Sequence, residues 1–285
     1  MTILEAVILG VIQGIFMFFP VSSTSHLALA QHALLSRGSN MPSPDSPEMI
    51  LFDLAVHVGT LVSIAWVFAP LLRTYLVHLT REVRTLSLGR LHRDPWPLHV
   101  RLTCLGVLTV GVTGIFGLLL RSPFERVFAN PVAIALCLTV TGCLLYFSDH
   151  LRPTRIGLRQ MGVKQATWIG IAQALALAPG LSRSGLTIVF ALMLGVKRRW
   201  AARYSFLIAI PTILAIATVQ LILVLRQSPP DSVAWIPMLV GAAVAAVVGV
   251  IALKIVLKLL LRAHFRIFAW YVWVLAGVVL WFHLA

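Results

Sequence analysis

The chain has 285 residues, of which 59% are hydrophobic and only 11% are charged, and its mean hydropathy is +0.95. A soluble domain carries roughly 45–50% apolar and about 25% charged residues, so this composition excludes an ordinary soluble protein and indicates an integral membrane protein. The formal net charge of +14 does not indicate a nucleic-acid partner, because most Lys and Arg residues lie in short segments between apolar runs, where they set topology and contact lipid headgroups.

Six apolar runs are long enough to cross a bilayer as helices, namely 50–69, 99–120, 131–147, 204–226, 233–256 and 267–284. Two further apolar regions, 3–36 and 165–196, are interrupted by Pro20 and by Pro179-Gly180, and each half contains only about 12–16 residues. At about 1.5 Å per residue, such a half is too short to cross a hydrocarbon core of about 30 Å. We therefore predict two re-entrant helical hairpins, each of which enters and leaves the membrane on one side.

The distribution of charge between these runs indicates how the chain is oriented. Lys and Arg are concentrated in the loops 70–98 and 148–164 and in the patches 197–203 and 254–266. The loops 37–48 and 227–232 are acidic or nearly neutral, and 121–130 is only weakly basic. Six spans with two re-entrant hairpins place every strongly basic segment on the cytoplasmic side, as the positive-inside rule requires. If each interrupted region instead crossed the membrane twice, the basic segments would lie on the same side. The evidence for re-entrance is therefore that each half is short and that each region is broken in its middle.

The two interrupted regions also begin alike. GVIQ (Gly10–Gln13) precedes Pro20 and a Ser-rich turn, and GIAQ (Gly170–Gln173) precedes Pro179 and another. Three spans follow each hairpin, and because three is odd the second copy enters from the opposite face. We predict an all-α polytopic membrane protein, one membrane domain over 1–285, with an inverted-topology repeat of about 1–150 and 160–285. The alternative to a repeat is chance similarity among apolar helices. If the repeat is real, the site should lie in the middle of the membrane, where the broken helices of inverted repeats meet.

Each break carries hydroxyl groups immediately before a helix restarts. Non-helical backbone at membrane depth is tolerated only where it is buried or lines a cavity. The hydroxyl residues are natural N-caps for the second half-helices: Ser22, Ser23 and Thr24 in the first break, and Ser182 and Ser184 in the second. Two helix N-termini directed at one cavity would also form an anion site, so the hydroxyls alone do not distinguish capping from function.

Two further side chains, Arg183 and His26, carry a stronger functional signal. Arg183 is a basic residue inside an apolar hairpin with no acid nearby in sequence, and its planar guanidinium suits a phosphate; a structural salt bridge is the alternative. His26 follows Ser23 by three residues, the spacing of a hydroxyl with a neighbouring acid or base, although a lone histidine in a membrane helix is often merely hydrogen-bonded. Asp53 and His57, four residues apart, form a weaker pair that we assign a supporting role.

Several motifs together resemble a known family. They are GVIQGIFMFFPVSSTSHL, FDLAVHVGTL, ALAPGLSRSGLTI, AARYSFLIAIPTI, VVGVIALKIVLKLL and FAWYVW, in this order. The chain resembles the undecaprenyl-diphosphate phosphatases, also called the bacitracin-resistance protein family, essentially from end to end. The resemblance implies removal of the terminal phosphate from a C55 isoprenoid diphosphate at the outer face of the bacterial inner membrane, which recycles the lipid carrier for peptidoglycan. It implies a polyprenyl diphosphate lipid and the membrane as partners and leaves a homodimer open.

The resemblance also implies roles for individual residues. Ser23 would be the nucleophile or an orienting hydroxyl, His26 its acid/base partner, and Arg183 the clamp on the diphosphate. Further substrate contacts would come from Gln13, Ser22, Thr24, Gly180, Ser182, Ser184, Gly185 and Thr187. Asp53, His57 and Gln173 would contact these residues rather than the substrate and would hold them in place.

The chain departs from the family pattern at two positions. The family has Glu or Gln followed four residues later by Glu; Gln13 fits the first position, but the second is Met17. The resemblance implies a divalent cation, Mg or Ca, and methionine can neither bind such a cation nor act as a base. Two functions therefore stay open: hydrolysis, or non-cleaving binding or translocation of a polyprenyl phosphate or diphosphate. Val272 replaces an arginine usual in the family.

Overall fold

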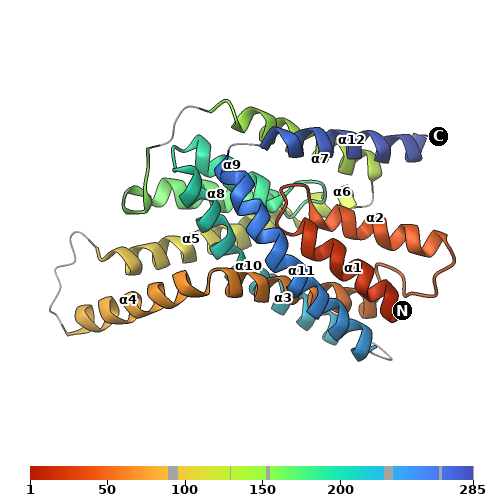
Figure 1. Ribbon diagram of the computed structural model, residues 1–285, viewed down its shortest axis with the longest axis horizontal. Coiled ribbons are helices and arrows are strands. Elements are labelled where there is room, and N and C mark those ends of the chain that lie inside the picture. The colour runs from red at the N-terminus through yellow and green to blue at the C-terminus, as the bar shows by residue number, and fades with distance from the viewer. Residues whose placement is uncertain (89–95, 129, 152–154, 228–233, 263–264, 285) are drawn as a thin grey trace.

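The computed structural model describes residues 1–285 except 89–95, 129, 152–154, 228–233, 263–264 and 285. The described chain is helical and contains no β-strand. Its α-helices are α1 (Ile3–Phe16), α2 (Ser23–Ser36), α3 (Pro47–Val67), α4 (Ala69–Ser87), α5 (Leu98–Leu119), α6 (Arg121–Phe128), α7 (Pro131–Ser148), α8 (Val163–Leu175), α9 (Arg183–Met193), α10 (Arg198–Gln227), α11 (Trp235–Leu261) and α12 (Phe265–Leu284). Figure 1 shows their arrangement.

Five of the described helices are long and apolar enough to cross a membrane, namely α3, α5, α7, α10 and α11. They coincide with five of the six predicted spans, so the prediction of an all-α polytopic membrane protein is confirmed. The sixth predicted span, 267–284, corresponds to α12. This helix is apolar, but its well-described part, Phe265–Trp281, is shorter than the five spans. The largest difference in a boundary is at α10, which begins six residues before the predicted 204 because the basic segment that precedes it is already helical.

The segment 70–98 is not the loop that its charges suggested. Most of it is α4, which follows α3 with only Phe68 between the two helices, and none of its residues is buried. Figure 1 shows α4 and the first turns of α5 side by side at one end of the molecule. A basic, exposed helix and a basic loop have the same composition, so loop charge could not separate them. Arg90 and Arg93 of the predicted loop, like most of 227–232, lie outside the described residues.

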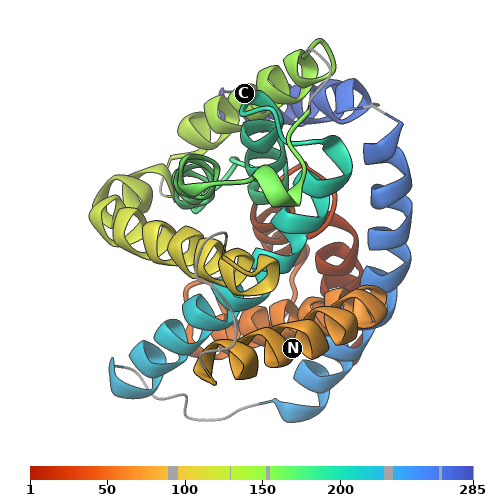
Figure 2. The same cartoon turned by 90° about the vertical axis from the view of Figure 1, so that its left-hand side faces the viewer.

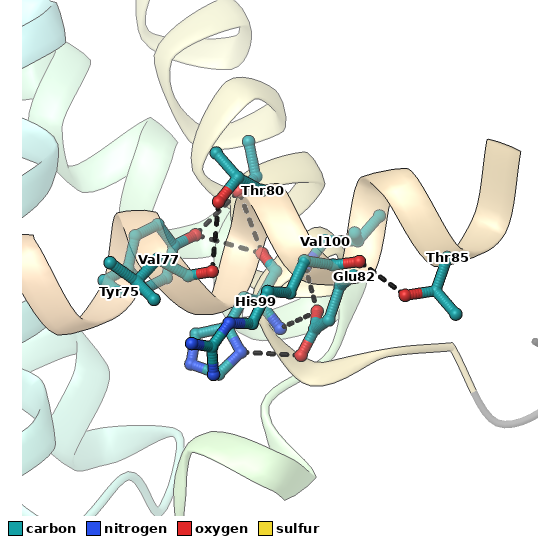
Figure 3. A network of polar contacts seen from close by, with 9 residues as sticks. Tyr75, Val77, Thr80, Glu82, Thr85, His99 and Val100 are labelled. Carbon is teal, nitrogen blue, oxygen red and sulfur yellow. Dashed lines mark hydrogen bonds and ion pairs between the residues drawn. The ribbon is translucent and has the colours of Figure 1, made fainter.

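The start of α5 is capped from α4. Pro97 precedes α5 and provides no side-chain cap. Instead, the Glu82 carboxylate accepts hydrogen bonds from the backbone N–H groups of His99 (2.9 Å) and Val100 (3.1 Å) and from His99 Nδ1 (2.6 Å) (Figure 3). A carboxylate beside the first N–H groups of a helix also faces the positive end of the helix dipole. This contact fixes α4 against α5.

Both interrupted regions form pairs of short helices, as predicted. α1 and α2 have 14 residues each, and α8 and α9 have 13 and 11. A helix of 14 residues is about 21 Å long, which is shorter than a hydrocarbon core of about 30 Å. In the view of Figure 2 the red α1–α2 hairpin and the blue-green α9 lie toward the middle of the molecule, with blue α11 along one side, α12 at the top and yellow α5 on the other side.

Each hairpin packs against a helix of the other half of the chain. Gly10 of α1 lies so close to α11 that a Cβ there would be 2.6 Å from the carbonyl oxygen of Gly241. Gly170 of α8 lies equally close to α5, where a Cβ would be 2.8 Å from the carbonyl oxygen of Thr109. The two contacts are reciprocal. α5 is the second spanning helix after the first hairpin and contacts the second hairpin, whereas α11 is the second spanning helix after the second hairpin and contacts the first. The inverted repeat and its boundaries stay predictions.

Candidate active site

The breaks of the two hairpins meet inside the protein. The backbone N–H of Gly180 donates to Ser22 Oγ at 3.2 Å, and Ser184 Oγ donates to the carbonyl oxygen of Phe19 at 3.4 Å. A Cβ on Gly185 would lie 3.4 Å from Pro20 Cβ, which is ordinary van der Waals contact. The structure therefore brings residues that are about 160 positions apart in sequence to one place, which we call the tip junction (residues 17–23 and 176–185).

The first break does not use its serine as a helix cap. Ser22 immediately precedes α2, but its hydroxyl makes no capping hydrogen bond and instead contacts Gly180 N–H and Ser25 Oγ (3.1 Å). Ser22 is also the one described non-glycine residue with positive φ, at +67°, a conformation that is costly for a residue with a side chain. The expected capping by this residue is wrong. The first N–H groups of α2 consequently have no side-chain partner among the described residues.

The second break does use its serine as a cap. Ser182 Oγ accepts a hydrogen bond from the Gly185 N–H at 3.2 Å, which confirms the expected N-cap of α9. Gly180 has φ of +90°, and a Cβ there would lie 2.6 Å from the carbonyl oxygen of Ile134, so this position requires glycine. Thr141 of α7 holds the turn, because its hydroxyl donates to the Gly180 carbonyl (2.9 Å) and accepts from the Ser182 N–H (3.3 Å).

Three polar groups converge on the sulfur of Met17 at the tip junction. Gln13 Nε2 lies 3.6 Å from Met17 Sδ, Ser23 Oγ lies 3.8 Å away, and Arg183 Nη2 lies 3.9 Å away. Gln13 is one turn earlier on α1, Ser23 begins α2, and Arg183 begins α9, so three helix ends contribute. A thioether is a weak acceptor, and each of the three groups can instead donate to a stronger one. The structure thus brings together Gln13, Ser23 and Arg183, as predicted from the sequence.

Arg183 has no carboxylate partner in the described part of the chain, where the ion pairs are His99–Glu82 and Arg198–Asp149. The alternative of a structural salt bridge is therefore not supported by the structure. A cation without a counter-ion at membrane depth is unfavourable, and an anionic ligand would relieve this cost.

His26 is not paired with Ser23, contrary to the interpretation of their spacing. Its Nδ1 donates to the Ser22 carbonyl oxygen (2.7 Å), which leaves Nε2 to accept from the Tyr271 hydroxyl (2.8 Å). The ring stacks on Phe16 of α1 with a centroid distance of 3.8 Å, and its Nε2 faces Tyr271 of α12 rather than the hydroxyl one turn earlier. The spacing placed both residues on one side of α2 but could not show that an aromatic pair fixes the ring. Tyr271 was missed, because a tyrosine in an apolar helix gives no distinct signal.

Asp53 and His57 are connected through the backbone rather than through their side chains. His57 Nδ1 donates to the carbonyl oxygen of Asp53 at 2.7 Å. The Asp53 carboxylate instead accepts from Gln31 Nε2 of α2 at 2.9 Å. Gln31, a buried residue that the sequence analysis missed, therefore joins α2 to α3 behind the first tip.

Three more of the predicted site residues, Gln173, Thr187 and Thr24, also lie outside the convergence on Met17. Gln173 is fully buried and donates to Thr113 Oγ1 (3.0 Å) and Thr212 Oγ1 (2.9 Å), so it joins α8 to α5 and α10. Thr187 donates to the carbonyl oxygen of Arg183 at 2.7 Å, within its own helix. Thr24 is exposed, and its hydroxyl lies 3.4 Å from Ser22 Oγ.

The family model for bacitracin resistance protein BacA matches residues 6–278, which include both hairpins and the tip junction. The chain belongs to this family. Proteins named undecaprenyl-diphosphatase from Halorhodospira halophila and Alkalilimnicola ehrlichii are each 52% identical to it, over 96% and 95% of this chain and 96% and 93% of their own. One from Methanobrevibacter smithii is 31% identical over 98% of this chain and 97% of its own.

The tip junction of this family member does not fit a metal ion held by the protein. Neither 13–26 nor 176–187 contains Asp or Glu. No group of three His, Cys, Asp or Glu side chains in the described ranges is placed to hold a metal. Magnesium and calcium prefer several oxygen ligands that include carboxylates, whereas the position between Gln13, Ser23 and Arg183 holds a thioether.

An apolar pocket lies apart from the tip junction. It has a volume of about 550 Å³ and lies between α3, α10 and α11. Its lining is almost entirely apolar: Leu51, Leu54, Ala55, Val58, Leu214, Ala217, Thr218, Leu221, Leu225, Trp235 and Met238. Such a lining suits hydrocarbon and offers nothing to a phosphate, so the anion site must be sought at the tips.

Proposed function

We propose that this protein hydrolyses undecaprenyl diphosphate to undecaprenyl phosphate and inorganic phosphate. Two relatives that are 52% identical over nearly the whole chain carry the name of this reaction. The product is the monophosphate form of the lipid carrier, so the reaction returns the carrier to envelope synthesis. The same names favour hydrolysis over non-cleaving binding or translocation of the lipid.

The observation that carries the proposal is the position of Arg183. Its guanidinium has no carboxylate partner among the described residues and lies where two broken helices meet. Arg183 Nη2 is 3.9 Å from the Met17 sulfur, on which Gln13 and Ser23 also converge. A planar guanidinium can form two parallel hydrogen bonds to a phosphate. The uncapped first turn of α2 adds backbone N–H groups and the positive end of a helix dipole. These groups suit an anion with several oxygens, as a diphosphate has.

The chemistry requires positioning and charge stabilisation more than covalent assistance. Attack on the terminal phosphorus breaks the bond to the bridging oxygen, and negative charge spreads over the phosphoryl oxygens in the transition state. Arg183 and the N–H groups at the start of α2 stabilise that charge. Ser23 attacks or orients the attacking water. His26 is held by Ser22 and Tyr271, so in this arrangement it positions the start of α2 rather than accepting the Ser23 proton.

We further propose that the protein lies in the bacterial inner membrane with the tip junction open to the outer, periplasmic side. Support comes from the basic segments, which the positive-inside rule places in the cytoplasm. Every residue of the tip junction comes from one chain, so the site does not require a second copy. A homodimer stays a separate prediction.

Phosphate release from undecaprenyl diphosphate by the purified protein in detergent tests the proposal. The wild type should release phosphate, and Ser23→Ala should lower the rate at least tenfold, because the hydroxyl next to Arg183 is lost. Ser36→Ala is the matched control: Ser36 lies at the far end of α2 and is exposed, and its hydroxyl donates to the Ala33 carbonyl oxygen of its own helix. The proposal is overturned if the wild type releases no phosphate, or if Ser23→Ala and Ser36→Ala are equally active.

A further inference from the structure

We infer that this protein binds the diphosphate group without a divalent cation held by the protein, because Met17 occupies the place of an anionic ligand. The inference rests on the proposed function only for the identity of the anion. The tip junction is inferred to bind the anion alone, rather than the anion together with a metal ion.

The first step is the arrangement around Met17 Sδ. Three groups from three helix ends, Gln13, Ser23 and Arg183, lie 3.6–3.9 Å from this sulfur. Such a convergence of donors is typical of a position that holds an oxygen anion. The thioether carries no charge, so nothing at this point neutralises Arg183. The tip junction is therefore positively charged before any substrate arrives.

The second step is what a divalent cation would encounter there. Its oxygen ligands would be neutral: the hydroxyl of Ser23 and Gln13 Oε1, which is buried and has no hydrogen-bond partner among the described residues. The guanidinium of Arg183 would repel it. On α3, the carboxylate of Asp53 is already bound by Gln31. Magnesium and calcium sites are built from carboxylates, so these residues favour binding of an anion over binding of a cation.

The third step is the consequence for the ligand. A diphosphate entering this site receives the full charge of Arg183, which an acid at position 17 would otherwise share. Gln13 and Ser23 can then donate to phosphate oxygens in place of the sulfur. Binding should therefore not depend on a metal ion, and a metal ion bound to the diphosphate should weaken the attraction to Arg183 rather than strengthen it.

Two binding measurements on the purified protein in detergent test this inference without turnover. Calorimetry with inorganic diphosphate in EDTA should show binding to the wild type. Electron paramagnetic resonance of added Mn²⁺, with no diphosphate present, should show no stoichiometric binding. The inference is overturned if the wild type binds Mn²⁺ stoichiometrically, or if diphosphate binds only after a divalent cation is added.

Variants of Met17 give the decisive comparison. Met17→Glu should lower the affinity for diphosphate in EDTA by about tenfold or more, because the carboxylate pairs with Arg183 and repels the anion. Met17→Leu is the matched control of similar size, and it should keep cation-independent binding within about threefold. If Met17→Glu does not fold, Met17→Gln replaces it, adding oxygen without charge, and should stay cation-independent.

Outcomes for the inference and for the proposed function are distinguishable. Wild type that binds diphosphate in EDTA but releases no phosphate from the lipid contradicts the proposed function and supports the inference. Wild type that releases phosphate only when Mn²⁺ or Mg²⁺ is stoichiometrically bound supports the function and contradicts the inference. A Met17→Glu variant with unchanged affinity in EDTA also contradicts it.

Discussion

The two hairpin tips start from similar sequences but contribute different groups to the site. In the first, Ser22 adopts a positive φ and directs its hydroxyl to Gly180 of the other tip. In the second, Gly180 takes the positive φ, and Ser182 caps its own helix. The first tip therefore provides neutral donors and free N–H groups, whereas the second provides the charge and a rigid turn. Similar sequence at two breaks does not imply equal function.

The two glutamines that precede the breaks also have different roles, because their amide groups contact different partners. Gln13 and Gln173 are both fully buried, and each has an Oε1 without a hydrogen-bond partner in the described chain. The amide nitrogen of Gln13 faces Met17 at the tip junction, whereas that of Gln173 binds two threonines in neighbouring helices. Only the first glutamine is in a position to contact substrate, and the second stabilises packing.

The largest effect is expected from removing the charge that the second tip provides. Arg183→Ala should lower phosphate release by roughly 10³-fold, because no other described cation lies at the convergence on Met17. Arg183→Lys keeps the charge but loses the planar fork, so its activity should be intermediate. Phosphate release under saturating substrate measures both. Activity of Arg183→Ala within threefold of wild type would show that the second tip does not provide the essential charge.

The next effect is expected at the turn of the second tip. Gly180→Ala should lower the free energy of unfolding by about 2–4 kcal/mol, because the new Cβ would meet the Ile134 carbonyl oxygen and the backbone has φ of +90°. Gly38→Ala is the control, since Gly38 also has positive φ, +85°, but nothing lies within 4 Å of its Cβ position. Thermal unfolding in detergent compares the two. If Gly180→Ala and Gly38→Ala lose the same free energy of unfolding, the loss comes from the positive φ and not from the contact with Ile134.

A smaller effect separates the serines of the two tips. Ser22→Ala leaves the buried Gly180 N–H without its acceptor, which costs about 1–3 kcal/mol, whereas Ser182→Ala removes a helix cap at a cost of about 1 kcal/mol. The melting temperature should therefore fall further for Ser22→Ala. Ser22→Gly loses the same hydroxyl but relieves the positive φ, so it should be more stable than Ser22→Ala. The opposite order of the two alanine variants would contradict this division of roles.

Much of the fold could be predicted because its signals are local. Apolar length predicted the spans, and Pro20 and Pro179-Gly180 marked both breaks. The meeting of Ser23 and Arg183 followed from the breaks and the unpaired charge, whereas the place of Gln13 in the site came from the resemblance to the family. What the sequence could not show depends on contacts between distant segments.

Three particular contacts illustrate that limit. The backbone of Ser22 turns its hydroxyl to the other hairpin, which capping statistics cannot foresee. Tyr271, nearly the whole chain away from His26, fixes the imidazole. Glu82 caps a helix that starts sixteen residues later, at Leu98, by accepting from the His99 N–H. In each case a tertiary partner determined the local geometry.

The smallest effect is expected at the start of α5, which lies outside the tips and is capped by a carboxylate rather than by a hydroxyl (Figure 3). Burial alone would raise the pKa of Glu82, but hydrogen bonds from the His99 side chain and the Val100 N–H outweigh it and hold that pKa below its ordinary value of 4.5. Stability from a carboxylate with a lowered pKa is complete above the pKa of the unfolded chain and is lost as pH falls through the folded pKa. Glu82→Gln should therefore lower the melting temperature by about 1–2 °C near neutral pH, and the difference should vanish in acid. Ser182→Ala should show no such dependence, because a hydroxyl cap does not titrate; a pH-independent difference for Glu82→Gln would contradict the assigned role.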